Sequence, residues 1–283
     1  MSETKFTSML SRARKIGRAV GAFTCYNIEE LEAVIMASEA LRAPAIVLIS
    51  PASFQSSGGE RLVKGFRAMV DDASTELLLQ LDHASDLRLF ERAAACGVDA
   101  VMADGSRLPY EDNLSFTRSV VLSMSNRAIG VEAELGRVEG NEDEVGEATV
   151  GAMTEPDKAA EFNRESGADC LAVAIGNVHG HYSGTPSLDW SRLEAIQHRN
   201  VHTLSLHGAS GLPGEDLRRA ALLGISKFNV NTELRAAYFE RLLEKLGPMS
   251  ETLNLKVLGE ELTKAVSEVV EQKLEAFGWT ERR

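Results

Sequence analysis

The feature that most constrains this chain is a regular alternation of short apolar runs with longer segments of helical period. The longer segments place apolar residues three or four positions apart, which indicates amphipathic helices. Helices are predicted over residues 28–41, 86–96, 110–125, 157–166 and 214–223. The eight apolar runs, predicted as strands, are residues 20–25, 45–50, 76–81, 99–103, 128–134, 169–175, 201–206 and 226–230. Eight strands that alternate with helices predict an α/β fold, the single-domain (β/α)8 or TIM barrel.

A doubly wound open sheet is the main alternative to a barrel. It would carry a glycine-rich nucleotide-binding turn after its first strand, and Cys25-Tyr26-Asn27 is not such a turn. Neither a GxGxxG nor a GxxxxGK pattern occurs in the chain. We therefore expect one barrel domain over residues 1–283, with an N-terminal helix that caps the barrel and a C-terminal helical extension at 253–277.

Charge and hydropathy exclude two classes of partner. The net charge of -12 at pH 7 repels phosphate backbones, so nucleic acid is not an expected partner. No apolar run approaches the ~20 residues that a membrane span requires, so no membrane association is expected. The cysteines Cys25, Cys96 and Cys170 are odd in number and form no CxxC pair. We expect reduced thiols in a cytoplasmic protein.

Histidines follow several of the predicted strands. In a (β/α)8 barrel the carboxyl ends of the strands meet on one face, and this face carries the active site. His83, His179 and His207 follow three different strands. Three imidazoles with an open fourth position are a common catalytic zinc site, so we expect these three to bind Zn²⁺. His181 remains an alternative to His179. His198 and His202 lack this placement and are expected to be surface or packing residues.

A second signal follows the last two predicted strands. Gly208-Ala209-Ser210-Gly211 places small residues and one hydroxyl where barrels often bind phosphate through backbone N–H groups. Thr232 can cap the final helix close by. Beside a metal site, these segments predict a small anionic substrate. The long acidic connection at 136–155 follows the fifth strand, and connections of this length are usually functional or mobile.

Motifs in a fixed order carry a family resemblance over nearly the whole chain. Gly21-Ala22-Phe23 with Asn27 comes first. The other motifs are Leu81-Asp82-His83, Met102-Ala103-Asp104-Gly105-Ser106, Glu132-Ala133-Glu134-Leu135-Gly136, Gly176-Asn177-Val178-His179-Gly180, Leu206-His207-Gly208-Ala209-Ser210-Gly211 and Asn229-Val230-Asn231-Thr232-Glu233-Leu234. Together they resemble the class II, zinc-dependent ketose-bisphosphate aldolases, which include fructose- and tagatose-bisphosphate aldolases. The short chain resembles the tagatose branch in particular.

The resemblance implies a reaction and its catalytic groups. The reaction is the reversible cleavage of a ketose 1,6-bisphosphate to dihydroxyacetone phosphate and an aldehyde such as glyceraldehyde 3-phosphate. Asp82 matches the acid/base at the cleaved bond, and Asn229 matches the residue that steadies the enediolate. Glu142, in the acidic connection, matches a proton-shuttling glutamate.

The resemblance also implies which residues bind the metal and the substrate. His83, His179 and His207 match the zinc ligands. Asp104 and Glu134 match a secondary site for a cation such as Na⁺ or K⁺. The positions that match substrate- or phosphate-binding residues are Asn27, Ser50, Gly180, Gly208, Ala209, Ser210, Asn229, Val230, Asn231 and Thr232.

Several alternatives stay open at this point. A Schiff-base lysine would be the other aldolase chemistry, but no lysine falls at a predicted C-terminal strand end, and Lys227 enters the last strand from the opposite side. A barrel metal hydrolase, prompted by His179-x-His181, and a non-catalytic sugar-phosphate-binding barrel remain alternatives. The sequence does not distinguish fructose from tagatose substrates. We expect a homodimer or homotetramer.

Overall fold

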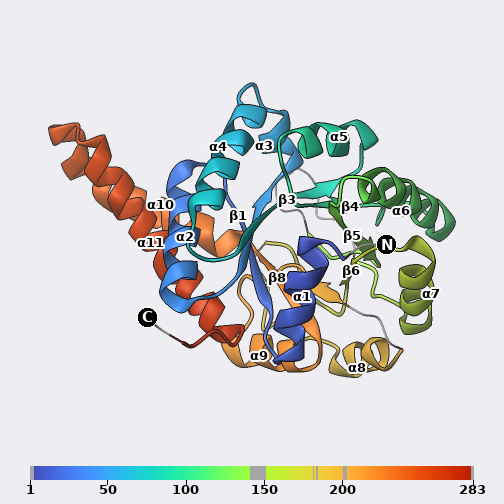
Figure 1. Ribbon diagram of the computed structural model, residues 1–283. Coiled ribbons are helices and arrows are strands. Elements are labelled where there is room, and N and C mark those ends of the chain that lie inside the picture. The colour runs from blue at the N-terminus through green and yellow to red at the C-terminus, as the bar shows by residue number, and fades with distance from the viewer. Residues whose placement is uncertain (1–2, 141–150, 181, 183, 200–202, 282–283) are drawn as a thin grey trace.

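The predicted alternation of strands and helices forms a closed parallel barrel. The computed structural model describes residues 3–140, 151–180, 182, 184–199 and 203–281. The strands pair in the order β1 to β8, and β8 closes on β1 (Figure 1). They are β1 Val20–Thr24, β2 Ala45–Ile49, β3 Leu77–Ala84, β4 Ala100–Ala103, β5 Gly130–Leu135, β6 Cys170–Val173, β7 Leu204–Leu206 and β8 Ile225–Val230. The predicted fold class is confirmed.

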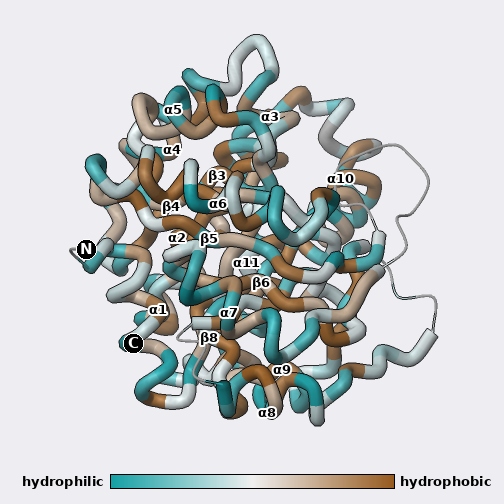
Figure 2. The backbone as a smooth tube through the Cα atoms, turned by 90° about the vertical axis from the view of Figure 1, so that its right-hand side faces the viewer, coloured by the Kyte–Doolittle hydropathy of each residue, from teal (hydrophilic) through white to brown (hydrophobic). Residues whose placement is uncertain are grey.

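Helices surround this barrel. They are α1 Lys5–Lys15, α2 Ile28–Leu41, α3 Pro51–Gln55, α4 Gly59–Asp72, α5 Leu87–Ala95, α6 Tyr110–Ser125, α7 Pro156–Ser166, α8 Trp190–His198, α9 Gly214–Leu222, α10 Thr232–Thr252 and α11 Leu255–Ala276. The strands are buried almost throughout, because barrel side chains fill one face and helices cover the other. Figure 2 shows the resulting contrast between hydrophobic segments in the interior and hydrophilic segments outside.

An irregularity in β3 sets the direction of two neighbouring side chains. The pairing of β3 with β4 shifts register between Leu81 and Ala84, and His83 has a positive φ of 43°. Successive residues of a regular strand point to opposite faces, and a bulge can re-aim one of them. Here Asp82 and His83 both reach the same end of the barrel, since Asp82 contacts Asn229 and His83 contacts His207.

Helix α1 covers the amino-terminal end of the barrel. It packs against β1, β5 and β8 and lies in front of β8 in Figure 1. The side chain of Phe6 in α1 is fully buried, and Gly130 at the start of β5 leaves room for it. A Cβ added at Gly130 would lie 2.6 Å from the Cβ of Phe6.

Gly130→Ala is therefore expected to destabilise the fold. Overpacking of a filled core costs about 1–3 kcal/mol, which lowers the melting temperature by roughly 2–10 °C in a chain of this size. Differential scanning calorimetry measures the change. Gly65→Ala is the matched control, because an added Cβ there meets no atom within 4 Å and Gly65 lies inside α4. Equal melting temperatures for the two variants would contradict the packing described for Phe6.

The last two helices extend beyond the barrel. α11 packs along α2 and against α10, and Figure 1 shows the α10–α11 pair projecting away from the strands. Large apolar side chains are exposed on this projection: Phe239, Leu243, Leu246, Leu253 and Leu255. Within the described parts of the chain, no helix combines the length and the apolar character that crossing a bilayer requires.

Candidate metal centre

Three histidines converge at the carboxyl-terminal end of the barrel. His83 comes from β3, His179 from the segment after β6, and His207 follows β7. Each offers one ring nitrogen, and these nitrogens lie within 4.8 Å of one another. The distance between Nε2 of His83 and Nδ1 of His207 is 2.8 Å. The three ring nitrogens are therefore close enough to one another to share a single metal ion.

Hydrogen bonds assign the nitrogen that each ring would present to a metal. Nδ1 of His83 lies 2.8 Å from a carboxylate oxygen of Asp104, which leaves Nε2 facing the centre. Nε2 of His207 lies 3.0 Å from Oε1 of Glu132, which leaves Nδ1 facing the centre. Nε2 of His179 is buried and has no hydrogen-bond partner among the described residues. Ligand histidines are commonly oriented in this way by carboxylates, so the donor set fits a divalent cation such as zinc.

Burial and neighbouring charges divide the histidines into two kinds. Burial is the main cause that lowers the pKa of His179 and of His207, which favours the neutral, metal-binding form of each ring. Burial also acts to lower the pKa of His83, but Asp82 and Asp104 raise it well above its ordinary value. The negative potential around His83 therefore favours a cation at this point.

Asp82 and Asn229 lie directly beside the histidines. The Asn229 side-chain amide donates to Oδ2 of Asp82 over 3.1 Å and lies 3.3 Å from Nδ1 of His207. Asp82 is buried, and its Oδ1 has no hydrogen-bond partner in the described part of the chain. Asp82 and His83 both line a cavity at this end of the barrel. A proton acceptor and a neutral donor thus flank the candidate metal position.

A second set of ligand atoms shares His83 with the first. His83, Asp104 and Glu134 bring their ligand atoms within 4.8 Å of one another. Burial acts to raise the pKa of Asp104, but His83 and two hydrogen bonds from Ser106 lower it below its ordinary value. Burial and the charge of Asp104 raise the pKa of Glu134 to about 8. These groups form the predicted secondary cluster.

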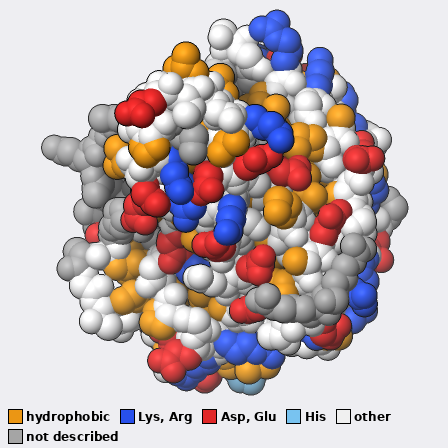
Figure 3. Space-filling model, turned by 90° about the vertical axis from the view of Figure 1, so that its left-hand side faces the viewer, with side chains coloured by type: hydrophobic (Ala, Val, Ile, Leu, Met, Phe, Trp, Pro, Cys, Tyr) orange, Lys and Arg blue, Asp and Glu red, His pale blue; other side chains and the backbone are white. Residues whose placement is uncertain are grey.

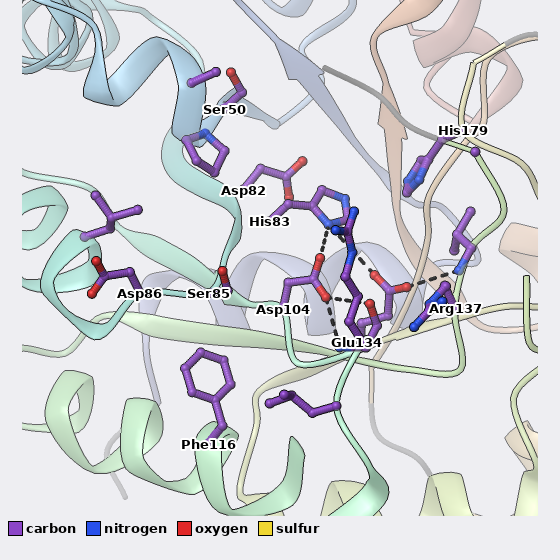
Figure 4. Close-up of a pocket in the computed structure, with 18 of the residues that line it drawn as sticks. Ser50, Asp82, His83, Ser85, Asp86, Asp104, Phe116, Glu134, Arg137 and His179 are labelled. Atoms are coloured by element: carbon purple, nitrogen blue, oxygen red, sulfur yellow. Dashed lines mark hydrogen bonds and ion pairs between the residues drawn. The ribbon is translucent and has the colours of Figure 1, made fainter. Parts of the chain in front are cut away.

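The candidate metal centre opens into a cavity of about 560 Å³. This volume lies in the range of small-molecule sites. Figure 4 shows Asp82, His83 and His179 arranged around the cavity, with Arg137 and Glu134 close by. Its other lining residues include Thr24, Ser50, Ser85, Asp86, Ser106, Arg107 and Phe116. Of the predicted substrate-binding residues, Ser50 lines this cavity, and its hydroxyl also accepts the amide N–H of Ser53 at the start of α3.

The predicted phosphate segments lie side by side. The amide of Ala209 donates to the carbonyl of Asn229 over 3.1 Å, which joins the segment after β7 to the end of β8. Gly208 has a φ of +63°, and a Cβ there would lie 2.1 Å from the carbonyl oxygen of Val178, so only glycine fits. Ser210 is buried, and its hydroxyl has no hydrogen-bond partner among the described residues.

The remaining predicted residues occupy different environments. Thr232 begins α10, Val230 ends β8 with its side chain fully buried, and Gly180 follows His179 with a φ of +88°. Asn231 donates to the Tyr26 hydroxyl over 3.0 Å. Asn27 caps α2 by accepting the amide of Glu30 and is not among the residues that line the cavity.

The remaining expectations concern Glu142, His181, His198 and the three cysteines. Glu142 and the alternative ligand His181 lie outside the described residues. His198, expected to be a surface or packing residue, is exposed at the end of α8, and His202 lies outside the described residues. The three cysteines are buried and not joined in disulfides.

One layer below the histidines lies a polar group to which the sequence analysis gave no role. Glu132 accepts hydrogen bonds from Gln80 and Ser205, and it forms an ion pair with Lys227. All four side chains are fully buried. Strand periodicity could have placed them on the inner face of the barrel, because Gln80, Glu132, Ser205 and Lys227 each precede a polar site residue by two positions along the chain.

Lys227 lies closer to the site than its sequence position suggested. Its Nζ lies 2.8 Å from Oε2 of Glu132 and 2.5 Å from Oδ1 of Asn229. The ammonium is thus held within the barrel and does not line the cavity.

Comparison with known proteins gives consistent results over the whole chain. The family model described as class II fructose-bisphosphate aldolase matches residues 4–282. The D-tagatose-1,6-bisphosphate aldolase subunit GatY of Klebsiella oxytoca is 39% identical over 236 residues, which cover 83% of either chain. A solved structure from Coccidioides immitis, of a protein considered a fructose-1,6-biphosphate aldolase, has a TM-score of 0.91 and 35% identity, covering 99% of this chain and 97% of that one. The YdjI aldolase of Escherichia coli K12 has a TM-score of 0.85 and 29% identity, covering 98% of each chain.

Proposed function

The chain belongs to the class II fructose-bisphosphate aldolase family, and we propose on this premise that it cleaves a ketose 1,6-bisphosphate of the fructose or tagatose type. The products are dihydroxyacetone phosphate and an aldehyde such as glyceraldehyde 3-phosphate, and the reaction is reversible. The observation that carries the proposal is the convergence of three histidine nitrogens within 4.8 Å of one another, beside Asp82 and Asn229.

We further propose that His83, His179 and His207 hold Zn²⁺. A bound zinc ion would supply Lewis-acid polarisation of the substrate's ketone and hydroxyl oxygens. The cluster of His83, Asp104 and Glu134 would hold a second cation such as Na⁺ or K⁺. Its two carboxylates offer the oxygen ligands that hard cations prefer.

The chain's own residues supply proton transfer and orientation. Asp82 would accept the proton of the hydroxyl group as the carbon–carbon bond breaks, and its unpartnered Oδ1 is the available acceptor. The Asn229 amide would donate to the oxygen on which negative charge develops. Glu142, outside the described residues, is proposed to return a proton to the released carbanion.

The segments after β7 and β8 would bind the phosphate next to the ketone. Backbone N–H groups of Gly208 and Ser210 and the amino-terminal end of α10 at Thr232 would provide donors for an anion, whereas the amide of Ala209 already donates to the carbonyl of Asn229. The buried hydroxyl of Ser210 offers one more donor. The remaining predicted contributors are Asn27, Ser50, Gly180, Val230 and Asn231. Asn27 would act indirectly, because its side chain caps α2.

Kinetics on a panel of ketose phosphates tests this function. Fructose 1,6-bisphosphate, tagatose 1,6-bisphosphate and their monophosphates would be assayed by coupled detection of dihydroxyacetone phosphate. We expect turnover of at least one bisphosphate, its loss on treatment with a chelator, and its return on addition of zinc. The 39% identity to GatY supports including the tagatose substrate. No chelator-sensitive product from any member of the panel would refute the proposal.

Ser210→Ala is expected to raise KM for the bisphosphate about tenfold and leave kcat within a factor of two. A hydrogen bond to a charged group contributes about 1.5–3 kcal/mol, and phosphate binding of this kind is common to ground state and transition state. Steady-state kinetics measures both constants. Ser119→Ala on the exposed surface of α6 is the control. An unchanged KM in Ser210→Ala would remove Ser210 from the phosphate site.

We propose that the protein is a cytoplasmic homodimer or homotetramer. The exposed apolar residues of α10, chiefly Phe239, Leu243 and Leu246, provide a surface that a second copy could cover. Figure 3 views the side from which α10 and α11 project, where apolar groups lie among charges of both signs. Sedimentation equilibrium measures the assembly, and Leu243→Glu would weaken it. The three buried, unbridged cysteines support a reducing compartment.

A further inference from the structure

We infer that Lys227 is a positioning residue for the aldol reaction. Through two separate contacts it fixes the orientation of the Asn229 side-chain amide and the ring nitrogen of His207 that carries the proton. The inference rests on the proposed function for its consequence in catalysis. Its structural basis is independent of the substrate, because it concerns only side chains of this chain.

The first contact determines which end of the Asn229 amide faces the reaction. A lysine ammonium has three donors and no acceptor. The Asn229 atom 2.5 Å from Nζ of Lys227 must therefore be the carbonyl oxygen. The amide nitrogen is then turned toward Asp82, over 3.1 Å, and toward the metal-binding histidines. Without Lys227 the two ends of the amide would be less strongly distinguished.

The second contact determines which nitrogen of His207 carries the proton. Lys227 neutralises Glu132, and Nζ lies 2.8 Å from Oε2. The other oxygen, Oε1, lies 3.0 Å from Nε2 of His207. A carboxylate can only accept here, so Nε2 carries the proton and Nδ1 stays available as the metal ligand.

The burial of the pair favours a positioning role over a purely stabilising one. The side chains of Lys227 and Glu132 are both fully buried. A buried ion pair often adds little net stability compared with apolar residues of similar volume, because both charges lose their hydration. The same pair is well suited to orient two neighbours. Asn229 faces the positive charge of Lys227, and His207 faces the negative charge of Glu132.

The test is the double substitution Lys227→Met with Glu132→Gln. Lys227→Met alone would leave an uncompensated buried carboxylate and could prevent folding. The double variant stays neutral, keeps side-chain length at both positions, and removes the donor to Asn229. The control is Arg67→Met with Asp99→Asn, which removes a partly buried ion pair (2.6 Å) near the amino-terminal end of β4, far from the histidines in the barrel.

Three measurements are compared between the zinc-loaded wild type and the two double variants. The first is the zinc dissociation constant, from competition with a chromophoric chelator. The second is kcat and KM on the best bisphosphate. The third is the ring ¹⁵N chemical shifts of His207 and the side-chain amide signals of Asn229, by NMR.

We expect the Lys227/Glu132 variant to bind zinc about 10–100-fold more weakly, the range found when partners of metal ligands are removed. With zinc saturating, kcat should fall about tenfold or more while KM changes less than twofold, and the Asn229 amide signals should shift. The control should keep all three values near wild type even if its melting temperature falls.

Zinc affinity and kcat both within twofold of wild type would overturn the inference. NMR spectra of the wild type that place the His207 proton on Nδ1 would also overturn the inference, and this measurement needs no variant. If the wild type binds zinc but cleaves no ketose bisphosphate, the proposed function fails. The zinc titration and the NMR spectra would then still decide the role of Lys227.

Discussion

His179→Ala is expected to remove tightly bound zinc and to lower kcat/KM by about 10³-fold or more. Loss of one of three ligands leaves two imidazoles, which is insufficient for a stable catalytic site. Lewis-acid stabilisation contributes several kcal/mol to the transition state, and each 1.4 kcal/mol corresponds to about tenfold in rate. Metal content by mass spectrometry and steady-state kinetics measure the two effects.

His179 suits this experiment because its removal should disturb the fold little. The ring is only partly buried, and Nε2 has no hydrogen bond to another described residue. His198→Ala is the control, since His198 is an exposed histidine on α8. We expect wild-type zinc content and activity in the control. A zinc content near one per chain in His179→Ala would instead assign the third ligand to another residue.

Asp82→Asn is expected to lower kcat about 10²- to 10⁴-fold while zinc remains bound. The amide keeps the size of the side chain but cannot accept the hydroxyl proton, and general acid–base catalysis typically contributes this factor. Pre-steady-state measurement of carbon–carbon cleavage, together with metal analysis, measures the effect.

The retained zinc makes this result specific. Asp82 is not one of the three histidine ligands, so a fall in kcat with zinc present assigns the loss to proton transfer. Burial of Asp82 next to Asn229 means that the variant must also be shown to fold, by its circular dichroism and melting temperature. A kcat within threefold of wild type would exclude Asp82 as the base.

The barrel could be predicted because its strands appear in the sequence as short apolar runs. Parallel strands covered on both faces require continuous apolar runs, and β2 (Ala45–Ile49) is such a run, buried throughout. The predicted run at 76–81 ended before the observed end of β3 at Ala84. Two of the last three residues of β3, Asp82 and His83, are polar, so the apolar run alone placed the end of the strand before them.

The histidine cluster could also be predicted, because a barrel brings its strand ends to one face whatever the details of packing. The layer beneath it was missed for a physical reason. Glu132 and Lys227 are charged residues inside strands, and their burial is possible only because β5 and β8 hold them as an ion pair across the barrel. Strand periodicity could place each residue on the inner face of its strand, but the pairing of Glu132 with Lys227 depends on three-dimensional register, which local periodicity does not contain.

The irregular backbone at Asp82 and His83 lets two consecutive residues reach one site, and this has a mechanical consequence. Because Asp82 and His83 are consecutive, their Cα atoms are held about 3.8 Å apart by one trans peptide unit. The proposed base and one metal ligand are therefore joined by one peptide unit, so that a displacement of the backbone at one of them also displaces the other. Any redesign that regularised β3 would turn one of the two side chains outward, so grafting this centre onto another barrel requires transferring the bulged backbone together with the two residues.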